Sequence, residues 1–201
     1  KIKRDLTRVT GANISVRVTD EFMEAVKIGD DYHQRWPVDS SDPEVQCYTN
    51  AREVWDALIE GAHASAEPGV LFWDTATRMT PSDAYTHAGF GSVSTNPCGE
   101  IILSPYDSCR LMLINLTSFV ENPWKKNAKF NYGDFRIIAK KAQRLMDDMI
   151  DLEVEQIDKI LAKIDNDPES DTVKYYERGL WERIRDVALT GRRTGLGITG
   201  L

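Results

Sequence analysis

The chain has 201 residues, of which 41% are hydrophobic and 28% charged, a balance typical of globular proteins with one sizeable core. Its net charge of −7 disfavours nucleic acid and anionic membranes as partners, although a small phosphorylated ligand needs only a local pocket. No segment approaches the roughly 20 apolar residues of a membrane span, and no signal-peptide core follows the basic N-terminus. These features predict a cytoplasmic protein that contacts neither membrane nor nucleic acid.

The first third of the chain alternates between strand and helix patterns. Polar and apolar residues alternate over 13–18, which predicts a half-buried strand, and Thr19-Asp20 then begins a helix. Residues 29–48 are rich in Asp, Pro and Ser and predict a long connection. A helix is expected over 51–65, capped by Asn50 and Glu53, and the apolar run 70–73 predicts a buried strand. Strand, helix, strand indicates an α/β fold with parallel strands.

The remainder is expected to contain two short strands and two long helices. Residues 75–100 resemble a loop, and apolar runs at 101–103 and 111–114 predict the strands. A helix is expected over 132–163 and another over 172–189, separated by a break at Asn166-Asp167-Pro168. In the first of these helices the apolar residues that recur at helical spacing are Ile138, Leu145, Met149, Leu152 and Ile160.

The three cysteines, Cys47, Cys98 and Cys109, do not form a recognisable disulfide or zinc pattern. Their number is odd, their spacing is irregular, and no histidine lies near Cys98 or Cys109 in sequence. No metal site is predicted. The cysteines are therefore either bystanders or chemically active thiols.

The segment with the most chemical content places an amide, a thiol and a carboxylate at alternate positions, Asn96, Cys98 and Glu100. Alternate residues of extended backbone face the same side, but these three would then span about 13 Å at ~3.3 Å per residue. They can share one small substrate only if the loop curls, and Pro97 and Gly99 suit a curl. From the residues alone, a plain Pro-Cys-Gly turn with a buried thiol remains the alternative.

Asn96-Pro97-Cys98-Gly99-Glu100-Ile101 resembles the active-site loop of ribonucleotide reductase large subunits. Four further segments resemble that family in the family's own order, from about residue 7 to the end. They are 14–16 with 20–23, 67–74, 108–116, and the Gly-Arg-Arg segment 191–197. The resemblance implies an α/β fold, part of a ten-stranded α/β barrel whose centre holds a cysteine finger loop. Residues 1–201 are then expected to be part of a single catalytic barrel domain, truncated at both ends.

The resemblance also implies a role for each residue of the loop. Cys98 would hold a thiyl radical that removes the ribose 3′ hydrogen, Glu100 would accept the 3′-hydroxyl proton, and Asn96 would hydrogen-bond the ribose hydroxyls. Pro97 and Gly99 complete the substrate-binding loop. Cys109 would be one of two thiols that deliver reducing equivalents and end as a disulfide; its partner lies upstream of this segment. Cys47 lies in an unrelated context and is interpreted as a bystander.

Within the family, the segment most resembles the adenosylcobalamin-dependent class II enzymes. Glu100 argues against the glycyl-radical branch, and the 11 positions from Cys98 to Cys109, with Pro105-Tyr106 between them, form a compact connection. The two-subunit class I enzymes are the alternative. The implied partners are a ribonucleoside di- or triphosphate substrate, dNTP and ATP effectors and a thioredoxin-like dithiol reductant; a homodimer is left open.

Two functions outside the family stay open. A thiol-nucleophile enzyme would need His33, His63 or His87 beside Cys98 in space and a thiol that alkylates rapidly at neutral pH. A non-catalytic nucleotide-binding module would bind nucleotide without removing its 2′ hydroxyl.

Three charged segments have interpretations of their own. The pair Arg192-Arg193 suits either a phosphate or the dipole at a helix end. The acidic cluster is expected to be a solvated helix face and not a metal site; its members are Asp147, Asp148, Asp151, Glu153 and Glu155. Residues 1–8 are basic, and in this family they would form the tail of the effector-sensing loop.

Overall fold

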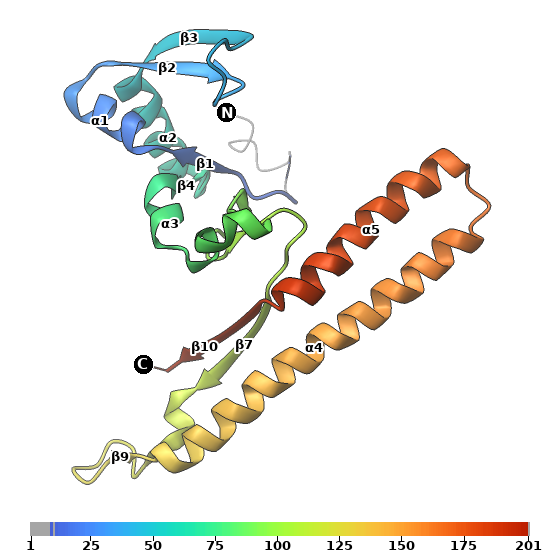
Figure 1. Cartoon of the computed structure of the whole chain (residues 1–201). Coiled ribbons are helices and arrows are strands. Elements are labelled where there is room, and N and C mark those ends of the chain that lie inside the picture. Colours follow the sequence, from blue (N-terminus) through green and yellow to red (C-terminus); the bar gives the residue numbers. More distant parts are fainter. Residues whose placement is uncertain (1–8, 10, 201) are drawn as a thin grey trace. The chain divides into compact units, whose positions relative to one another are not determined.

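The computed structural model describes residue 9 and residues 11–200, in two compact units divided after Pro105 (Figure 1). The basic segment 1–8 lies outside the described residues. Both units mix helices with paired strands, as expected for an α/β protein. Within the described part of the chain the strands pair two by two and do not close into a barrel.

The first unit is built on a parallel strand pair with two helices packed beside it. Strand β1 (Ser15–Val18) pairs in parallel with β4 (Gly69–Phe72), and the helices are α1 (Asp20–Ile28) and α2 (Ala51–Ser65). Burial of Val18, Phe22, Val26 and Ala51 forms the core of this unit. The predicted succession of strand, helix and parallel strand is confirmed.

Side-chain caps explain where these two helices begin. Thr19 Oγ1 accepts a hydrogen bond from Phe22 N at 3.1 Å, and Asn50 Oδ1 accepts one from Glu53 N at 3.2 Å. Each cap satisfies a backbone N–H that has no partner inside its helix. The predicted bounds 51–65 of α2 are confirmed.

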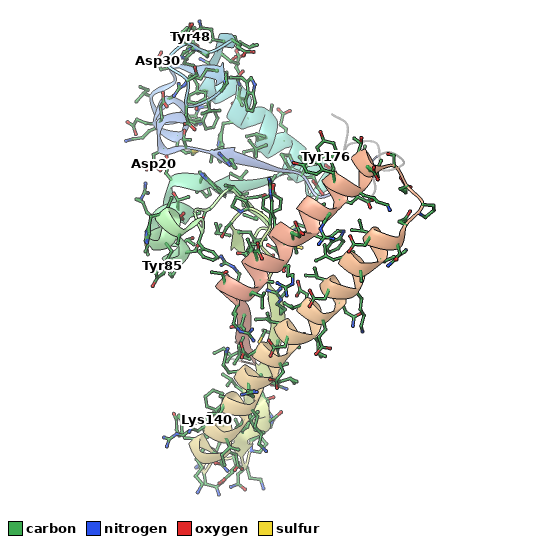
Figure 2. The ribbon with its side chains drawn as sticks, turned by 45° about the vertical axis from the view of Figure 1, so that its right-hand side comes forward. Asp20, Asp30, Tyr48, Tyr85, Lys140 and Tyr176 are labelled. Atoms are coloured by element: carbon green, nitrogen blue, oxygen red, sulfur yellow. The ribbon has the colours of Figure 1, made fainter. Side chains whose placement is uncertain are left out.

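The predicted connection over 29–48 is wrong, because most of it is an antiparallel hairpin. Strand β2 (Asp31–Trp36) pairs with β3 (Val45–Asn50), the strand on which Tyr48 lies (Figure 2). His33 stacks on Tyr48 with 4.7 Å between ring centroids. The Pro, Asp and Ser residues gather at 37–43, between two runs that contain β-forming aromatic and branched residues. The turn composition therefore marks only the connection between the two strands.

Residues 75–100 contain more structure than the expected loop. Helix α3 (Trp73–Met79) follows β4 directly, the 3₁₀ segment η2 (Pro81–Ala88) comes next, and the short strands β5 (Ser94–Thr95) and β6 (Ile102–Leu103) pair with each other. Trp73 therefore starts a helix and does not belong to the buried strand. Phe72 is 50% exposed, so β4 is less buried than its apolar composition predicted.

The second unit joins a parallel strand pair to two long antiparallel helices (Figure 1). Strand β7 (Arg110–Asn115) pairs with β10 (Thr194–Thr199), while α4 (Tyr132–Asn166) and α5 (Asp171–Gly191) pack against each other. Between β7 and α4 lie η3 (Leu116–Phe119) and the small hairpin of β8 (Val120–Glu121) with β9 (Lys129–Phe130). The two helices and β7 are confirmed. Strand β10 was missed because its glycines weaken a strand pattern.

The buried face of α4 is not the one formed by the apolar residues whose spacing predicted the helix. Of those residues, Leu145 is 53% and Leu152 58% exposed, and Ile138 and Met149 are also exposed. The buried stripe consists of Ala142, Met146, Ile150, Val154, Ile157 and Ile164. Both sets recur at helical spacing, and periodicity alone does not say which stripe another element covers.

Across residue 9 and residues 11–200, no helix combines the length and the apolar composition that crossing a membrane requires.

Candidate functional site

The segment 94–103, called the finger loop below, is a tight hairpin whose turn carries the predicted site residues. Its base is closed by Asn96 N, which donates to Ile101 O at 3.1 Å, and its tip by Gly99 N, which donates to Asn96 O at 3.0 Å. Gly99 has a φ of +83°, a conformation that glycine adopts without steric cost. The predicted curl of this segment is confirmed.

The three functional groups of the finger loop have different environments. Asn96 is half-buried, and its Oδ1 accepts a hydrogen bond from Ile101 N at 3.0 Å, which turns its carbonyl toward the loop. The amide NH₂ of Asn96 is then the part that can donate to a ligand. Cys98 and Glu100 are exposed. The alternative of a turn with a buried thiol is therefore wrong.

Contacts with β1 and β4 hold the finger loop within the first unit. Arg17 Nη1 donates to Val93 O at 3.1 Å, just before the loop, and the same guanidinium lies 4.3 Å from the centroid of the Trp73 ring. On the other side, a Cβ added to Gly99 would lie 3.1 Å from Leu71 Cδ2. The loop tip thus packs closely on β4, and a larger residue at position 99 would push it away.

A cavity of about 210 Å³ lies beside the finger loop. Alternate residues of one chain segment, Asn13, Ser15 and Arg17, line one side, and loop residues 94–97 line the other. The volume is below the ~300–1,000 Å³ of pockets that hold whole drug-sized ligands, and it suits a fragment such as a sugar ring. None of these three polar residues was among the predicted site residues. Their alternation over 13–17, leading into β1, was the available signal, because alternate residues of extended backbone face the same side.

Cys109 belongs to the second unit, where it directly precedes β7 and is half-buried. Its Sγ would lie 2.7 Å from a Cβ added to Gly195 of β10, so the sulfur occupies the space that a side chain would take. The neighbouring Arg110 is buried; its Nε donates to Glu153 Oε2 of α4 at 2.7 Å and its Nη1 to Arg193 O at 3.3 Å. Cys109 is thus carried by a strand that is fixed to α4 and to the start of β10.

The arginine pair after α5 binds carboxylates of its own unit. Arg192 Nε donates to Asp147 Oδ1 at 2.7 Å and its Nη1 to Asp151 Oδ1 at 2.8 Å. This hydrogen bond from Arg192 lowers the pKa of Asp147, and the two carboxylates raise the pKa of Arg192. Arg193 Nε donates to Asp107 Oδ2 at 2.6 Å, and the Asp107 side chain is only 3% exposed.

These pairs bear on two interpretations made from the sequence. The acidic cluster of α4 is not simply a solvated face, because Asp147, Asp151 and Glu153 each bind an arginine from another element. Arg192 and Arg193 are likewise engaged by carboxylates, so neither guanidinium is left for a phosphate alone, and Arg192 also caps the C-terminal end of α5 as the dipole interpretation expects. Sequence spacing could not reveal contacts between residues about 40 or more positions apart.

The remaining candidates lie away from the finger loop or have other contacts. Cys47 is exposed on β3, and its Sγ donates to Gln34 Oε1 at 3.3 Å. The Cys98 sulfur contacts Asn13 Nδ2 at 3.9 Å, and this neutral amide cannot act as the base of a Cys-His nucleophile. Among residue 9 and residues 11–200, no group of three or more His, Cys, Asp or Glu side chains is placed to hold a metal ion.

Comparison with known proteins places the whole segment in one family. The family described as "Ribonucleotide reductase, barrel domain" matches residues 1–201, and the chain therefore belongs to the ribonucleotide reductase barrel-domain family. Similar proteins include the vitamin B12-dependent ribonucleoside-diphosphate reductases of Thermoplasma acidophilum, 39% identical over 155 residues, and of Mycobacterium tuberculosis (strain H37Rv), 35% identical over 141 residues. The vitamin B12-dependent ribonucleotide reductase of Rhodopirellula baltica is 31% identical over 130 residues.

The matched regions cover 74%, 70% and 64% of this chain in these three comparisons. They cover only 18%, 18% and 12% of the respective relatives, so the chain spans a small part of the length of each.

Proposed function

We propose that this chain is the finger-loop segment of an adenosylcobalamin-dependent (class II) ribonucleotide reductase, which converts ribonucleotides to 2′-deoxyribonucleotides by thiyl-radical chemistry. The observation that carries the proposal is an exposed Cys98 on a curled loop, between Asn96 and Glu100, in which Asn96 and Pro97 also line a cavity of about 210 Å³. Relatives described as vitamin B12-dependent reductases support the choice of class II over the two-subunit class I enzymes.

Cys98 would exchange a hydrogen atom with the substrate. Its thiyl radical removes the 3′ hydrogen of the ribose, which forms an S–H bond and leaves a radical at C3′. Glu100, exposed two residues further along, accepts the 3′-hydroxyl proton as a general base. At the end of the cycle the Cys98 S–H returns its hydrogen atom to C3′, and the thiyl radical is restored.

Asn96 would hold the sugar through its amide NH₂. Its carbonyl already accepts from Ile101 N, so the orientation of the amide plane is set by the loop itself. An amide held in this way can donate to the ribose hydroxyls without reorganising during loss of the 2′ hydroxyl as water. Pro97 and Gly99 would shape the backbone that faces the sugar.

Cys109 would supply one of the two thiols that reduce the substrate. Replacing the 2′ hydroxyl with hydrogen requires two electrons, and two thiols provide them by forming a disulfide. The second thiol would come from chain upstream of this segment, and an external dithiol, such as a thioredoxin-like protein, would reopen the disulfide.

Adenosylcobalamin, when bound, would supply the radical that oxidises the Cys98 thiol. The exposure of Cys98 at the loop tip fits this requirement, because the sulfur is accessible from outside the unit.

The two units would belong to one ten-stranded catalytic barrel, as one family match over both suggests. The complete enzyme would take a ribonucleoside di- or triphosphate, respond to dNTP and ATP effectors, and work in the cytoplasm. Cytoplasmic conditions keep thiols such as Cys98 and Cys109 reduced between turnovers.

The decisive test uses the intact protein, recovered with the sequence that flanks this segment, and assays ribonucleotide reduction with a dithiol. We expect product only when adenosylcobalamin is present, and without a second protein subunit. Cys98→Ser should abolish product formation, because a hydroxyl does not replace the weak S–H bond. Cys47→Ser, which changes another exposed thiol of the first unit, should retain full activity.

Three outcomes would redirect the assignment. Activity that requires a second metal-containing subunit instead of the cofactor would establish class I. Normal turnover by Cys98→Ser would exclude the radical role of this residue. Binding of nucleotide without loss of the 2′ hydroxyl in any reconstituted form would favour a non-catalytic module.

A further inference from the structure

We propose that Asn13 is a positioning residue for the Cys98 thiol, holding the tip of the finger loop from the segment that leads into β1. This inference rests on the proposed radical role of Cys98. Asn13 Nδ2 donates to Pro97 O at 3.2 Å and approaches Cys98 Sγ at 3.9 Å. One amide group thus contacts both the backbone that carries the thiol and the sulfur itself.

The hydrogen bonds within the finger loop fix its base and turn but not the thiol. They join Asn96 to Ile101 and Gly99 to Asn96. The Cys98 side chain lies outside these bonds, in an exposed part of the turn. Asn13, 84 positions before Pro97, is therefore the polar contact that restrains the sulfur.

Asn13 is well placed for this role because both backbone polar groups of the next residue, Ile14, are hydrogen-bonded. Ile14 N donates to Glu67 Oε2 at 2.9 Å, and Gly69 N donates to Ile14 O at 2.9 Å. The parallel pairing of β1 with β4 begins directly afterwards, with Ser15 opposite Gly69. The amide thus projects from an anchored backbone segment onto a loop, which is how a scaffold keeps a reactive group in place.

The chemistry of the contact requires a donor. A carboxamide NH₂ has two hydrogens, enough for one carbonyl oxygen and one sulfur, and a thiol sulfur is a weak acceptor. Aspartate has the same shape but presents only acceptors, which would face the Pro97 carbonyl without a hydrogen bond. Asn13→Asp therefore separates the loss of donation from the loss of volume, and Asn13→Ala removes both.

The kinetic test compares Asn13→Ala and Asn13→Asp with the unchanged enzyme in the intact protein. We expect both variants to lower kcat by about 10- to 100-fold, because small displacements of a reacting group are costly, while KM changes less than about threefold. The isotope effect on kcat for substrate carrying deuterium at the ribose 3′ position should rise, since hydrogen abstraction becomes rate-limiting. A merely structural defect would lower the active fraction and leave that isotope effect unchanged.

A second measurement does not depend on turnover. Hydrogen exchange of the finger-loop amides should become about fivefold faster in Asn13→Ala, as expected for loss of one neutral hydrogen bond. Peptides from the β2–β3 hairpin should be unaffected. The matched control is Asn166→Ala, which removes an amide-to-carbonyl bond of the same type, from Nδ2 to Ala162 O at 2.8 Å in the second unit. It should change neither kcat nor the finger-loop exchange.

The two measurements distinguish the possible failures. Unchanged loop exchange, or a kcat retained in Asn13→Asp, would overturn the positioning role of Asn13. If the unchanged intact enzyme reduces no ribonucleotide while exchange still rises in Asn13→Ala, the proposed function fails and Asn13 keeps its role as the anchor of Cys98.

Discussion

The two candidate cysteines are held by different kinds of interaction. Cys98, in the first unit, lies on an exposed turn that is fixed by neutral hydrogen bonds of 3.0–3.2 Å and by the contact of Gly99 with Leu71. Cys109, in the second unit, precedes a strand fixed by ion pairs from buried or partly buried arginines to α4 and to Asp107.

This difference matches the chemistry proposed for each thiol. A radical-bearing thiol must meet the sugar and its radical source, which requires exposure, and each neutral hydrogen bond contributes only about 1 kcal/mol. A thiol that alternates between reduced and disulfide forms must stay in the same position while the bond to its partner sulfur forms and breaks. Ion pairs that fix both Arg110 and Arg193 keep β7 and β10 in place through such a change.

Among the substitutions that test this difference, Glu153→Ala is expected to have the largest effect on local stability. The substitution leaves the buried Arg110 without its carboxylate partner. Breaking a buried ion pair typically costs ~3–5 kcal/mol, and because the Glu153 side chain is 32% exposed we expect about 3 kcal/mol. Hydrogen exchange of the β7 amides in the intact protein should then be roughly 100-fold faster, with the finger loop unchanged.

Asp148→Ala is the matched control for that experiment. Asp148 pairs with Arg144 one turn away on the same helix, at 2.8 Å, and both side chains are well exposed. Pairs of this kind contribute about 0.3–0.5 kcal/mol, so β7 exchange should barely change. Equal effects of the two substitutions would show that the buried pair of Arg110 with Glu153 fixes β7 no more firmly than an exposed pair on α4 does.

An intermediate effect is expected from Gly195→Ala, which tests the packing around Cys109. The added methyl would lie 2.7 Å from Cys109 Sγ and 3.0 Å from Arg110 O, and the latter is backbone that cannot rotate away. Overpacking of this kind costs about 1–3 kcal/mol and should displace the thiol. In the intact protein, we expect single-turnover reduction by pre-reduced enzyme to slow by at least about tenfold, measured as deoxynucleotide formed per enzyme.

Gly179→Ala provides the control glycine in the same unit. It lies inside α5, and a Cβ added there meets nothing within 4 Å. Alanine should stabilise the helix by about 0.5–1 kcal/mol and leave the single-turnover rate unchanged. If Gly195→Ala also left that rate unchanged, close packing of Cys109 on β10 would have no part in the reaction.

Much of this arrangement could be predicted from local sequence signals. The caps at Thr19 and Asn50 and the break after Asn166 define their helices within a few neighbouring residues, so a single sequence is sufficient to locate them. The curl of the finger loop was predictable for the same reason, from Pro97 and Gly99. The assignment of the loop to a reductase came from motif resemblance, which physical patterning alone could not supply.

The errors concern what surrounds each element. The stripe of Leu145 and Leu152 has as regular a helical spacing as the stripe that is buried, and only tertiary packing decides between them. Asn13 and the pair of Arg192 with Asp147 join positions far apart in the chain, so no window of sequence contains both partners. Strand β10 is glycine-rich because side chains of β7 lie over Gly195 and Gly197, a constraint that is visible only once the strands are paired.

The smallest effect is expected from acid, through the pair of Asp147 and Arg192. The hydrogen bond from Arg192 lowers the pKa of Asp147 below the value of about 3.9 for an unfolded chain. A lowered pKa in the folded state means that the pair stabilises the junction of α4 with the end of α5 above pH ~4, and that this contribution is lost as pH falls further. Hydrogen exchange of peptide 188–194 in the intact protein, corrected for the intrinsic effect of pH, should therefore become faster as the pH falls from 5 to 3.

In Asp147→Asn, this peptide should already exchange faster at pH 5, and its exchange should rise less steeply as the pH falls. Asp148→Asn is the control, because its partner Arg144 lies on the same helix, and it should follow the unchanged protein. An equally steep rise of exchange with falling pH in Asp147→Asn would mean that a group other than Asp147 controls the stability of this junction.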